Sequence, residues 1–498
     1  MNIAIRVDAS NKIGTGHFMR CLTLADVLNQ RGAQIHFICR HLPEHLGGML
    51  MEKNHGLTRL DSALVEAAAD DLAHADWLGV SQQQDAQDTV AALSYQTWDW
   101  LVVDHYALDA QWESALRQTA SKLLAVDDIA DRQHDCDVLL DQNFYADKHS
   151  RYTGKVPEHC MLLLGPRYAL LRDQFRQLRK QTEPRTGTVK RVLIFFGGVD
   201  EENYTGLALQ TLADMAVPDM DVDVVIGTQH PCRTEIEAAC VQHGFACHVQ
   251  TSRMAELMAQ ADLCIGAGGI ATWERCCLGL PTIAMPTAEN QRRQTVDAAS
   301  SGLLVMHDED DDLGFHIKAM MDNEGLRESL SRNGMQAVDG FGASRVAGRM
   351  GCSGIQMRTA TIEDTERLFT WRNHPAIRQV SRNADEIKRE DHNRWIAIVL
   401  SDPNRPLLIG ECNGSPVGVV RFDIDGTKAE VSIYLIPDGD NTTDGWSLLQ
   451  TAERWLSVNR PQVVTLQAEV LETNERSQRL FLASGYQPGP DSYSKRVH

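Results

Sequence analysis

The first forty residues contain the feature that most constrains the fold. Residues 1–8 alternate apolar and polar side chains as a strand does, and a turn with glycines follows. Residues 19–30 then carry apolar side chains at the spacing of an amphipathic helix, which Gly32 ends, and residues 35–39 form a second apolar run. A strand, a helix and a strand in such quick succession predict a βαβ unit with a parallel sheet.

The same pattern recurs along the next three hundred residues. A polar stretch at residues 179–190 indicates a linker between two successive series of strands and helices. We therefore expect an α/β fold with a GT-B-like pair of open parallel-sheet domains, at residues 1–180 and 190–345, whose ligands lie at the carboxyl ends of strands. The strands expected in these two series are at residues 100–103, 123–126, 138–140, 191–196, 222–226, 263–265 and 282–285.

A third domain is expected over residues 355–498. The glycine-containing run at residues 345–353 breaks the preceding pattern, and antiparallel-looking strands follow it. The Asn413-Gly414 pair between the first two of these strands is a strong hairpin signal. The mixture of helices and antiparallel strands predicts an α+β domain, with strands at residues 407–411, 416–422 and 429–435.

Composition excludes several classes of function. The formal net charge is -20 without clustered Lys and Arg, which argues against nucleic acid as a partner. The twelve cysteines are scattered without a Cys-x-x-Cys pair, which favours reduced thiols in a reducing compartment. The sequence has no stretch of about 18 apolar residues and no signal-peptide pattern, so we expect a cytoplasmic protein without membrane insertion.

The turn after the first strand reads Gly-Thr-Gly-His at residues 14–17. Gly14 and Gly16 let the backbone approach a ligand closely, and amides at a helix start can hold an anion such as phosphate. His17 would lie beside them, where a neutral imidazole can take a proton from water. Taken alone, such a turn is weak evidence, because a single histidine near a turn is structural more often than catalytic.

The wider string from Ile5 to Ala25 closely resembles the UDP-2,4-diacetamido-2,4,6-trideoxy-β-L-altropyranose hydrolases of pseudaminic acid biosynthesis. The resemblance covers roughly residues 1–345. It implies a GT-B fold, and hydrolysis of the anomeric bond to UDP without a metal or other cofactor. It also assigns His17 as the base for the attacking water. Tyr106, which follows a Val-Asp pair as a family tyrosine does, is expected to line the sugar site; the alternative is an ordinary half-buried aromatic.

A second glycine loop is expected to bind the nucleotide. The string Gly266-Ala267-Gly268-Gly269 lies between an expected strand and helix, so Gly268 and Gly269 would present amides to the diphosphate. Glu274, about one turn into that helix, would bond the ribose hydroxyls. Similar strings occur in the second domain of the glycosyltransferase that makes lipid II, where the matching glutamate holds the ribose. A packing turn is the alternative interpretation of the glycines.

Two further polar positions match a family string. Asn290 and Gln291 are expected to bind the sugar or the phosphate, although Asn290 could instead cap a helix. The aspartates and histidine of residues 127–135 are metal-ligand types, but their spacing fits no standard site, so we expect no metal. The acidic residues 308–312 indicate a solvated loop.

From Ile355 onward the chain resembles the GNAT acetyltransferase superfamily, through the strings at residues 357–364 and 474–486. Active members bind acetyl-CoA through a glycine-rich loop after the fourth strand, which makes Gly445 and Asn474 candidate acetyl-CoA contacts here. The acetyltransferase of the same pathway acetylates the 4-amino group of the UDP-sugar immediately before the hydrolase acts. A second activity, and other enzymes of that pathway as partners, follow from the resemblance.

The GNAT-like domain departs from the pattern of active members. Asn441 and Thr443 stand where glycines usually stand, and three aspartates lie where negative charge would repel a pyrophosphate. Phe481 takes the place of the tyrosine that protonates the CoA thiolate in many members. Glu430 can still serve as a base. An active acetyltransferase and a degenerate domain that aids folding or association both remain open.

The leading prediction is hydrolysis of a UDP-linked diacetamido-trideoxy sugar, with N-acetylation of the UDP-4-amino sugar precursor as a second activity. The alternative is a UDP-sugar-dependent glycosyltransferase with a non-catalytic GNAT-like domain, because the same fold supports that chemistry. A non-catalytic UDP-sugar sensor is disfavoured by the intact Gly-x-Gly-His motif. The sequence does not indicate the stereochemistry of the sugar or the oligomeric state.

Overall fold

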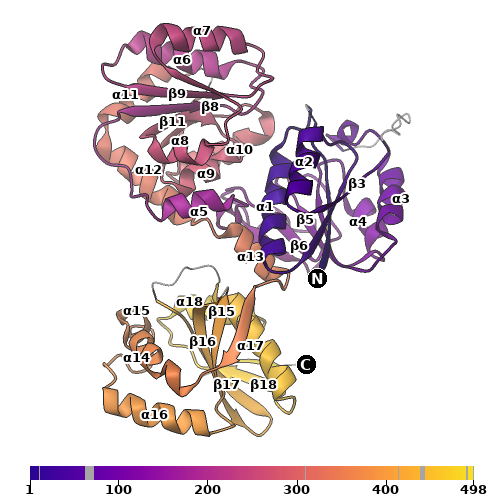
Figure 1. Cartoon of the computed structure of the whole chain (residues 1–498), viewed down its shortest axis with the longest axis vertical. Coiled ribbons are helices and arrows are strands. Elements are labelled where there is room, and N and C mark those ends of the chain that lie inside the picture. The colour runs from indigo at the N-terminus through magenta and orange to yellow at the C-terminus, as the bar shows by residue number, and fades with distance from the viewer. Residues whose placement is uncertain are drawn as a thin grey trace. The chain divides into compact units, whose positions relative to one another are not determined.

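The chain divides into two compact units, Met1–Ala343 and Ser344–His498 (Figure 1). A computed structural model describes residues 1–10, 12–61, 72–308, 310–412, 414–437, 444–489 and 492–496. Asn413 of the expected hairpin turn, and Asn441 and Thr443 of the expected acetyl-CoA loop, lie outside these residues.

The first half of unit 1 is built on a parallel sheet that has seven strands among the described residues, in the order β3-β2-β1-β4-β5-β6-β7. The strands are β1 (Asn2–Val7), β2 (Gln34–Cys39), β3 (Gly56–Arg59), β4 (Trp98–Asp104), β5 (Ala120–Val126), β6 (Val138–Asp141) and β7 (Met161–Leu164). The helices are α1 (Gly16–Gln30), α2 (Glu44–Glu52), α3 (Gln82–Leu93) and α4 (Ala110–Leu116), with short 3-10 turns η1 (Ala75–Trp77) and η2 (Pro166–Tyr168). Helix α5 (Asp173–Arg179) follows in the chain, but its Phe175 packs in the core of the second half. Because the chain runs outward in both directions from the β1–β4 pair, the carboxyl ends of these two strands form a topological switch point.

The second half of unit 1 has a parallel sheet with the order β10-β9-β8-β11-β12-β13 in the described part of the chain. Its strands are β8 (Arg191–Phe195), β9 (Asp221–Ile226), β10 (Ala246–Val249), β11 (Leu263–Ala267), β12 (Thr282–Met285) and β13 (Val305–Met306). Its helices are α6 (Tyr204–Met215), α7 (Arg233–His243), α8 (Met254–Gln260), α9 (Ala271–Cys277), α10 (Glu289–Ser300), α11 (Leu313–Asp322) and α12 (Glu324–Ala337). The β8–β11 pair gives this half a switch point of its own.

Alternation along the buried strands explains why helices cover both faces of the second sheet. Val192 and Ile194 of β8 pack with side chains of α6, α7 and α11, whereas Leu193 packs with side chains of α8 and α9. Figure 1 shows α6 and α7 on one side of this sheet and α8 and α9 on the other. Strands that are apolar on both faces are typical of parallel sheets covered by helices, which is why the sequence shows them as continuous apolar runs.

Unit 2 is built on a mixed sheet with the order β14-β15-β16-β17-β18-β20-β19 over the described residues. Its strands are β14 (Ile355–Thr359), β15 (Leu407–Cys412), β16 (Ser415–Asp425), β17 (Lys428–Leu435), β18 (Thr465–Ala468), β19 (Gln487–Pro488) and β20 (Tyr493–Arg496). Its helices are η3 (Ile362–Asp364), α14 (Thr365–Asn373), α15 (Pro375–Arg378), α16 (Arg389–Ser401), α17 (Gly445–Asn459) and α18 (Glu475–Ala483). The faces of β15 and β16 alternate between a core with α17 and a core with α14 and α16, which lie on opposite sides of the sheet (Figure 1).

The expected fold class is confirmed: two parallel-sheet α/β domains, GT-B-like in arrangement along the chain, precede an α+β domain with a mixed sheet. One local expectation is wrong. The glycine-containing run after residue 345 is not a break in regular structure at its start, because helix α13 (Gly342–Arg349) covers it. Gly348 sits where a side chain would collide with Ser447 of α17, so this glycine serves close packing within a helix. None of the helices in the described residues is long and apolar enough to cross a membrane.

Candidate functional site

The first switch point brings together the loops that follow β1 and β4. Val7 at the end of β1 pairs with Asp104 at the end of β4. Gly14 adopts a positive φ of 77°, which glycine tolerates best, and its amide donates to the carbonyl of Ser10 at 2.8 Å. Helix α1 begins at Gly16, so His17 lies in the first turn of the helix, directly beside the end of β4.

His17 forms a close pair with a buried aspartate. Its Nδ1 lies 2.5 Å from Oδ1 of Asp104, which is completely buried at the side chain. The Asp104 carboxylate only accepts hydrogen bonds, so we assign the proton of the imidazole to Nδ1, where Nη2 of Arg20 also lies 3.1 Å away, and Nε2 then carries the free lone pair. The His17 side chain keeps 10% of its surface exposed, so the ring is not sealed from solvent. The arrangement is that of a histidine base oriented by a carboxylate.

Arg20, one turn along α1, fixes the same aspartate. Its Nε donates to Oδ2 of Asp104 at 2.6 Å and its Nη2 to Oδ1 at 2.7 Å, a bidentate pair. Its Nη1 donates to Asp128 at 2.8 Å. Burial alone would raise the pKa of Asp104, but Arg20 and His17 hold that pKa well below its ordinary value. Asp104 is therefore a carboxylate at neutral pH and can support a positive charge on His17.

The Tyr106 ring packs against the His17 ring. The two ring centroids are 4.6 Å apart in an edge-to-face arrangement, and the Tyr106 hydroxyl donates to Asp128. Burial, and then the charge of Asp128, raise the pKa of Tyr106, so it stays a neutral phenol. His74 and Trp77 pack on the same ring, with centroids 5.2 and 5.6 Å from it. Tyr106 thus belongs to the wall that holds His17, and its hydroxyl is committed to Asp128.

The charged residues in and just after β1 form buried ion pairs. Arg6 is completely buried and bonds both Asp8 and Asp85, with Nη1 and Nη2 contacts of 2.7 Å. Asp8 in turn accepts the backbone amides of Arg40 and His41 after β2, at 2.7 and 3.1 Å. Asp8 therefore ties the end of β1 to the end of β2.

The second glycine loop is shaped largely by packing on α10. The amide of Gly268 donates to the carbonyl of Met285 at 2.8 Å, and a side chain at Gly268 would lie 2.2 Å from Oγ1 of Thr295. The amide of Gly268, which we expect to face a diphosphate, is thus bonded to the end of β12 in this structure. A side chain at Gly269 would meet Gln291 at 3.3 Å. A side chain at Gly16 would lie 3.3 Å from Ile270, so the glycine loop approaches the His17 loop of the first half.

Glu274 lies in α9 and pairs with an arginine from the end of the first half. Its Oε1 lies 3.3 Å from Nη2 of Arg172, and its side chain is 17% exposed. Burial raises the pKa of Glu274, and Arg172 opposes that rise. The neighbouring Trp273 is buried and donates to Asn143 at 2.9 Å, and Asn143 donates to Asp128 at 3.2 Å. A chain of hydrogen bonds thus connects α9 to the carboxylates around His17.

The two polar positions of α10 differ in surroundings. Asn290 is exposed in the first turn of the helix. The alternative in which Asn290 caps the helix is wrong, because the N-cap position belongs to Ala288. Gln291 accepts from the Thr287 amide at 3.2 Å and from the Thr287 hydroxyl at 3.1 Å. Gln291 therefore stabilises the turn before α10 and lies beside Gly269.

Unit 2 contains a cavity of about 510 Å³ next to the place where two strands part. β17 pairs with β18 from Lys428 to Glu430, and β17 then runs on to Leu435. The residues of β17 beyond this pairing line the cavity, together with side chains of α14, α16 and α18. A cavity of this size is within the range that binds small molecules.

Of the predicted residues of unit 2 that the structure describes, Glu430, Asn474 and Phe481 line this cavity and Gly445 does not. Glu430 lines the cavity and is 3.4 Å from Arg382. Asn474 also lines it, although its side chain caps α18 by accepting from the Ser477 amide at 3.1 Å. Phe481 faces it as a nearly buried ring. Gly445 begins α17 and is not among the lining residues; a side chain there would meet Leu480 at 3.2 Å.

Several residues around His17 and around the cavity are not predicted from the sequence. Two sequence signals could have identified Asp104 and Arg20. Asp104 ends an apolar strand, and Arg20 is three residues after His17 on a helix, so the two side chains share a helix face. Asp128 also follows an apolar strand, at residues 123–126, but its contact with Arg20 depends on how the fold brings the two segments together. In unit 2, Tyr434 lines the cavity, and burial raises the pKa of this phenol.

Comparisons with known proteins relate the chain to one domain family and to several proteins. Residues 355–487 match the acetyltransferase (GNAT) domain family. The uncharacterized protein MJ1062 of Methanocaldococcus jannaschii is 22% identical over 505 residues, which span 98% of this chain and 96% of that protein. The UDP-2,4-diacetamido-2,4,6-trideoxy-beta-L-altropyranose hydrolase of Campylobacter jejuni is 24% identical over 304 residues, 61% of this chain and 97% of that protein.

A further relative matches a shorter stretch. The acetyltransferase PseH of Campylobacter jejuni is 28% identical over 120 residues, which span 24% of this chain and 74% of that protein. The chain is thus homologous to the hydrolase and carries a C-terminal GNAT acetyltransferase domain. It has enzymes among its relatives for both activities that the sequence suggested.

Proposed function

We propose that unit 1 hydrolyses UDP-2,4-diacetamido-2,4,6-trideoxy-β-L-altrose to the free sugar and UDP, with His17 as the catalytic base. The observation that carries the proposal is the 2.5 Å pair between His17 and the buried Asp104 at the switch point of the first sheet. Ligands of open α/β sheets lie at such points. The homology to a hydrolase of this substrate supports the choice of reaction.

In the proposed reaction, Nε2 of His17 takes a proton from water while the water oxygen bonds to the anomeric carbon. The bond between that carbon and the diphosphate oxygen breaks, and UDP leaves with the electron pair. Asp104 stabilises the imidazolium that forms, because it keeps its negative charge beside Nδ1. The diphosphate is a good leaving group without protonation, so the step needs a base more than an acid. A positioned base contributes about 10²- to 10⁴-fold to such a rate.

The nucleotide would be held by the second half of unit 1. We assign Glu274 to the ribose hydroxyls, since a carboxylate at the start of α9 can accept two hydrogen bonds. We assign Gly14, Gly16 and Gly269 to the diphosphate, because glycines let the backbone approach a ligand closely. Asn290 is exposed and Gln291 is beside Gly269, so both are candidates for the sugar or phosphate oxygens.

The test of this proposal is turnover of the UDP-linked diacetamido sugar by the full chain and by His17→Asn. We expect the variant to lose at least about 10³-fold in kcat, while UDP binding measured by calorimetry changes less than threefold. The matched control is His149→Asn, an exposed histidine of the same unit, which should keep full activity. Activity of His17→Asn within tenfold of the parent would overturn the assignment.

We further propose that unit 2 acetylates the 4-amino group of the UDP-sugar precursor, with acetyl-CoA as the donor. The cavity beside the parting strands and the position of Glu430 in its wall support this activity. The amine nitrogen would bond to the acetyl carbonyl carbon, the carbon–sulfur bond would break, and Glu430 would take the proton of the amine. Phe481 has no hydroxyl to protonate the departing thiolate, and the phenol in the cavity wall is that of Tyr434.

Calorimetric titration of the full chain with acetyl-CoA tests whether unit 2 is active. We expect saturable binding, and Glu430→Gln should keep that binding while losing at least about tenfold in acetylation rate. The control is Asp425→Asn, which removes one negative charge at the end of β16 and so shows the effect of a change in charge alone. No heat of binding at high micromolar acetyl-CoA would contradict the proposal and favour a structural role for the domain.

A further inference from the structure

We propose that His307, Asp311 and His316 form a binding site for a divalent transition metal such as Zn²⁺ in the second half of unit 1. The site is independent of the hydrolysis assigned to His17, which needs no metal in the reaction written above. Imidazole nitrogens together with a carboxylate oxygen are a common ligand set for zinc, and they also suit nickel and cobalt.

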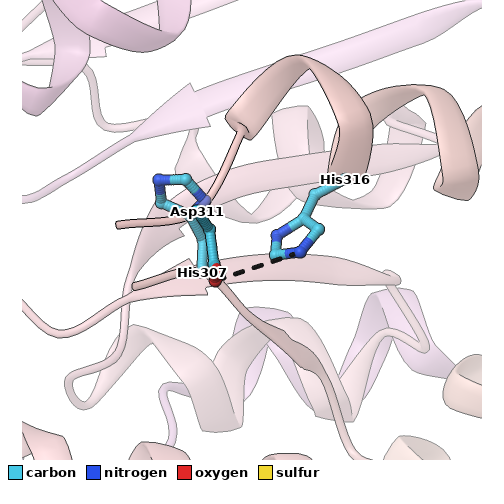
Figure 2. Close-up of side chains that lie close together, drawn as sticks. All are labelled: His307, Asp311 and His316. Carbon is cyan, nitrogen blue, oxygen red and sulfur yellow. Dashed lines mark ion pairs between the residues drawn. The ribbon is translucent and has the colours of Figure 1, made fainter. Parts of the chain in front are cut away.

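The fold brings three separate parts of the chain to this place. His307 follows the edge strand β13, Asp311 lies in the loop after it, and His316 is in the first turns of α11. One ring nitrogen of each histidine and one carboxylate oxygen of Asp311 all lie within 4.8 Å of one another. Figure 2 shows the His316 ring turned toward Asp311, and the Nε2 to Oδ2 distance is 4.0 Å.

A buried nitrogen atom without a partner is a second observation that points to a bound metal. His307 is only 6% exposed, and its Nδ1 is buried without a hydrogen-bond partner among the described residues. Burying an imidazole nitrogen without a partner costs free energy, and most buried polar atoms in proteins have one. The His307 ring, which packs edge to face on the His316 ring at 5.4 Å, therefore needs an explanation that packing alone does not supply.

The geometry is close to that of a metal site and can contract to it. Zinc–nitrogen bonds of about 2.0–2.1 Å in a tetrahedron place ligand atoms about 3.4 Å apart. The ligand atoms must therefore move together by about an ångström. Asp311 can make most of that movement, because its side chain is 45% exposed and lies in a loop. Three protein ligands leave a fourth position for water or for a donor from elsewhere.

The same loop is connected to the nucleotide side of the fold. The amide of Asp308 donates to Asp311 at 2.9 Å, and the Asp308 carboxylate pairs with Arg292 of α10 at 2.9 Å. Arg292 is the residue after Gln291. A metal that fixes Asp311 would therefore support the start of α10 through Asp308 and Arg292. The predicted result is a rise in thermal stability when metal binds.

The experiment uses the full chain without a polyhistidine tag, treated with a chelator and then titrated with Zn²⁺ in a calorimeter. We expect one tight equivalent, with a dissociation constant in the micromolar range or below. His316→Ala and Asp311→Asn, which change partly exposed side chains, should each weaken that equivalent by at least about tenfold. His149→Ala, an exposed histidine elsewhere in unit 1, should leave it unchanged.

Cobalt distinguishes this site from the twelve free cysteines of the chain. Co²⁺ bound by nitrogen and oxygen gives visible bands without the strong near-ultraviolet absorption of cobalt–thiolate bonds. The proposal predicts the first spectrum, and its loss in His316→Ala. Zinc binding that is equally tight in both variants, a thiolate spectrum, or no binding up to millimolar metal would each overturn the site. Circular dichroism of the variants shows whether they remain folded.

Discussion

The two candidate active sites of this chain differ in how their charged groups are held. Around His17, the side chains of Asp104 and Arg20 are almost fully buried and bonded to one another. In the cavity of unit 2, Glu430 and Arg382 are 41% and 58% exposed. A buried, fully bonded network is preorganised for a charge that develops during a reaction, whereas an exposed pair is screened by water and contributes little. The comparison favours unit 1 as the more completely formed site.

The largest effect that we expect on activity is that of replacing Asp104. Asp104→Asn should lower kcat for hydrolysis by about 10²- to 10³-fold, because His17 loses the negative charge that stabilises its imidazolium form. Steady-state kinetics with the UDP-sugar measure this. The variant should also lose about 3–5 kcal/mol of stability, since Arg20 keeps a buried charge without its full partner.

Asp85→Asn separates the catalytic effect from the loss of stability. Asp85 is as buried as Asp104 and pairs with Arg6 and Arg40, but it does not touch His17. We expect a similar loss of stability in urea unfolding, and kcat within threefold of the parent at a temperature where both variants are folded. Equal losses of kcat in Asp104→Asn and Asp85→Asn would mean that Asp104 acts only through the fold.

A smaller effect concerns the pH dependence of unit 1. His134 is buried 2.8 Å from Glu113 and 3.5 Å from Asp127. Burial alone would lower the pKa of His134, but the two carboxylates raise it to about 9, from 6.5. The protonated ring therefore stabilises the folded state fully below pH 6.5, and this contribution disappears as the pH rises to about 9. One buried group with this shift contributes about 3 kcal/mol.

His134→Gln tests that contribution. The difference in unfolding free energy between the parent and His134→Gln should be largest at pH 6 and should shrink toward pH 9.5, as measured by urea denaturation. His149→Gln, at an exposed position, should show no such trend. A difference that is constant with pH would show that His134 carries no proton in the folded state. Unit 2 is not expected to contribute to this trend, which again separates the two units.

The smallest expected effect is a gain of activity in unit 2. Phe481→Tyr would place a hydroxyl on a ring that lines the cavity. If unit 2 transfers acetyl groups, the variant should do so up to about tenfold faster, because a phenol can protonate the thiolate. Phe481→Leu, which adds no donor, is the control, and release of free thiol is the measurement. A rate unchanged in Phe481→Tyr would indicate that Tyr434 or water already supplies this proton.

Much of the fold was predictable because parallel strands buried on both faces appear as short apolar runs. The runs at residues 191–196 and 282–285 correspond to β8 and β12 almost residue for residue. β13 was not predictable, because two residues at a sheet edge carry no periodicity. The helix α13 was missed because glycines usually end helices, whereas Gly348 here permits close packing on Ser447.

The candidate site was predictable only where local sequence fixes the position of a side chain. His17 follows a strand and a glycine turn, so its place at the switch point could be inferred. Asp128 and the amide of Gly268 depend on which segments the fold brings together. The metal ligands His307 and His316 are on a strand end and a helix, and their spacing matches no standard motif. Such a cluster is visible only in three dimensions.

The central claim is attack of water on the anomeric carbon at the His17 site. Incubation of the UDP-linked diacetamido sugar with the enzyme in ¹⁸O-labelled water, followed by mass spectrometry of both products, tests it most directly. The account predicts that the label enters the free sugar, that UDP remains unlabelled, and that no acceptor is needed. Label in the phosphate of UDP, or product only when an acceptor is added, would contradict it.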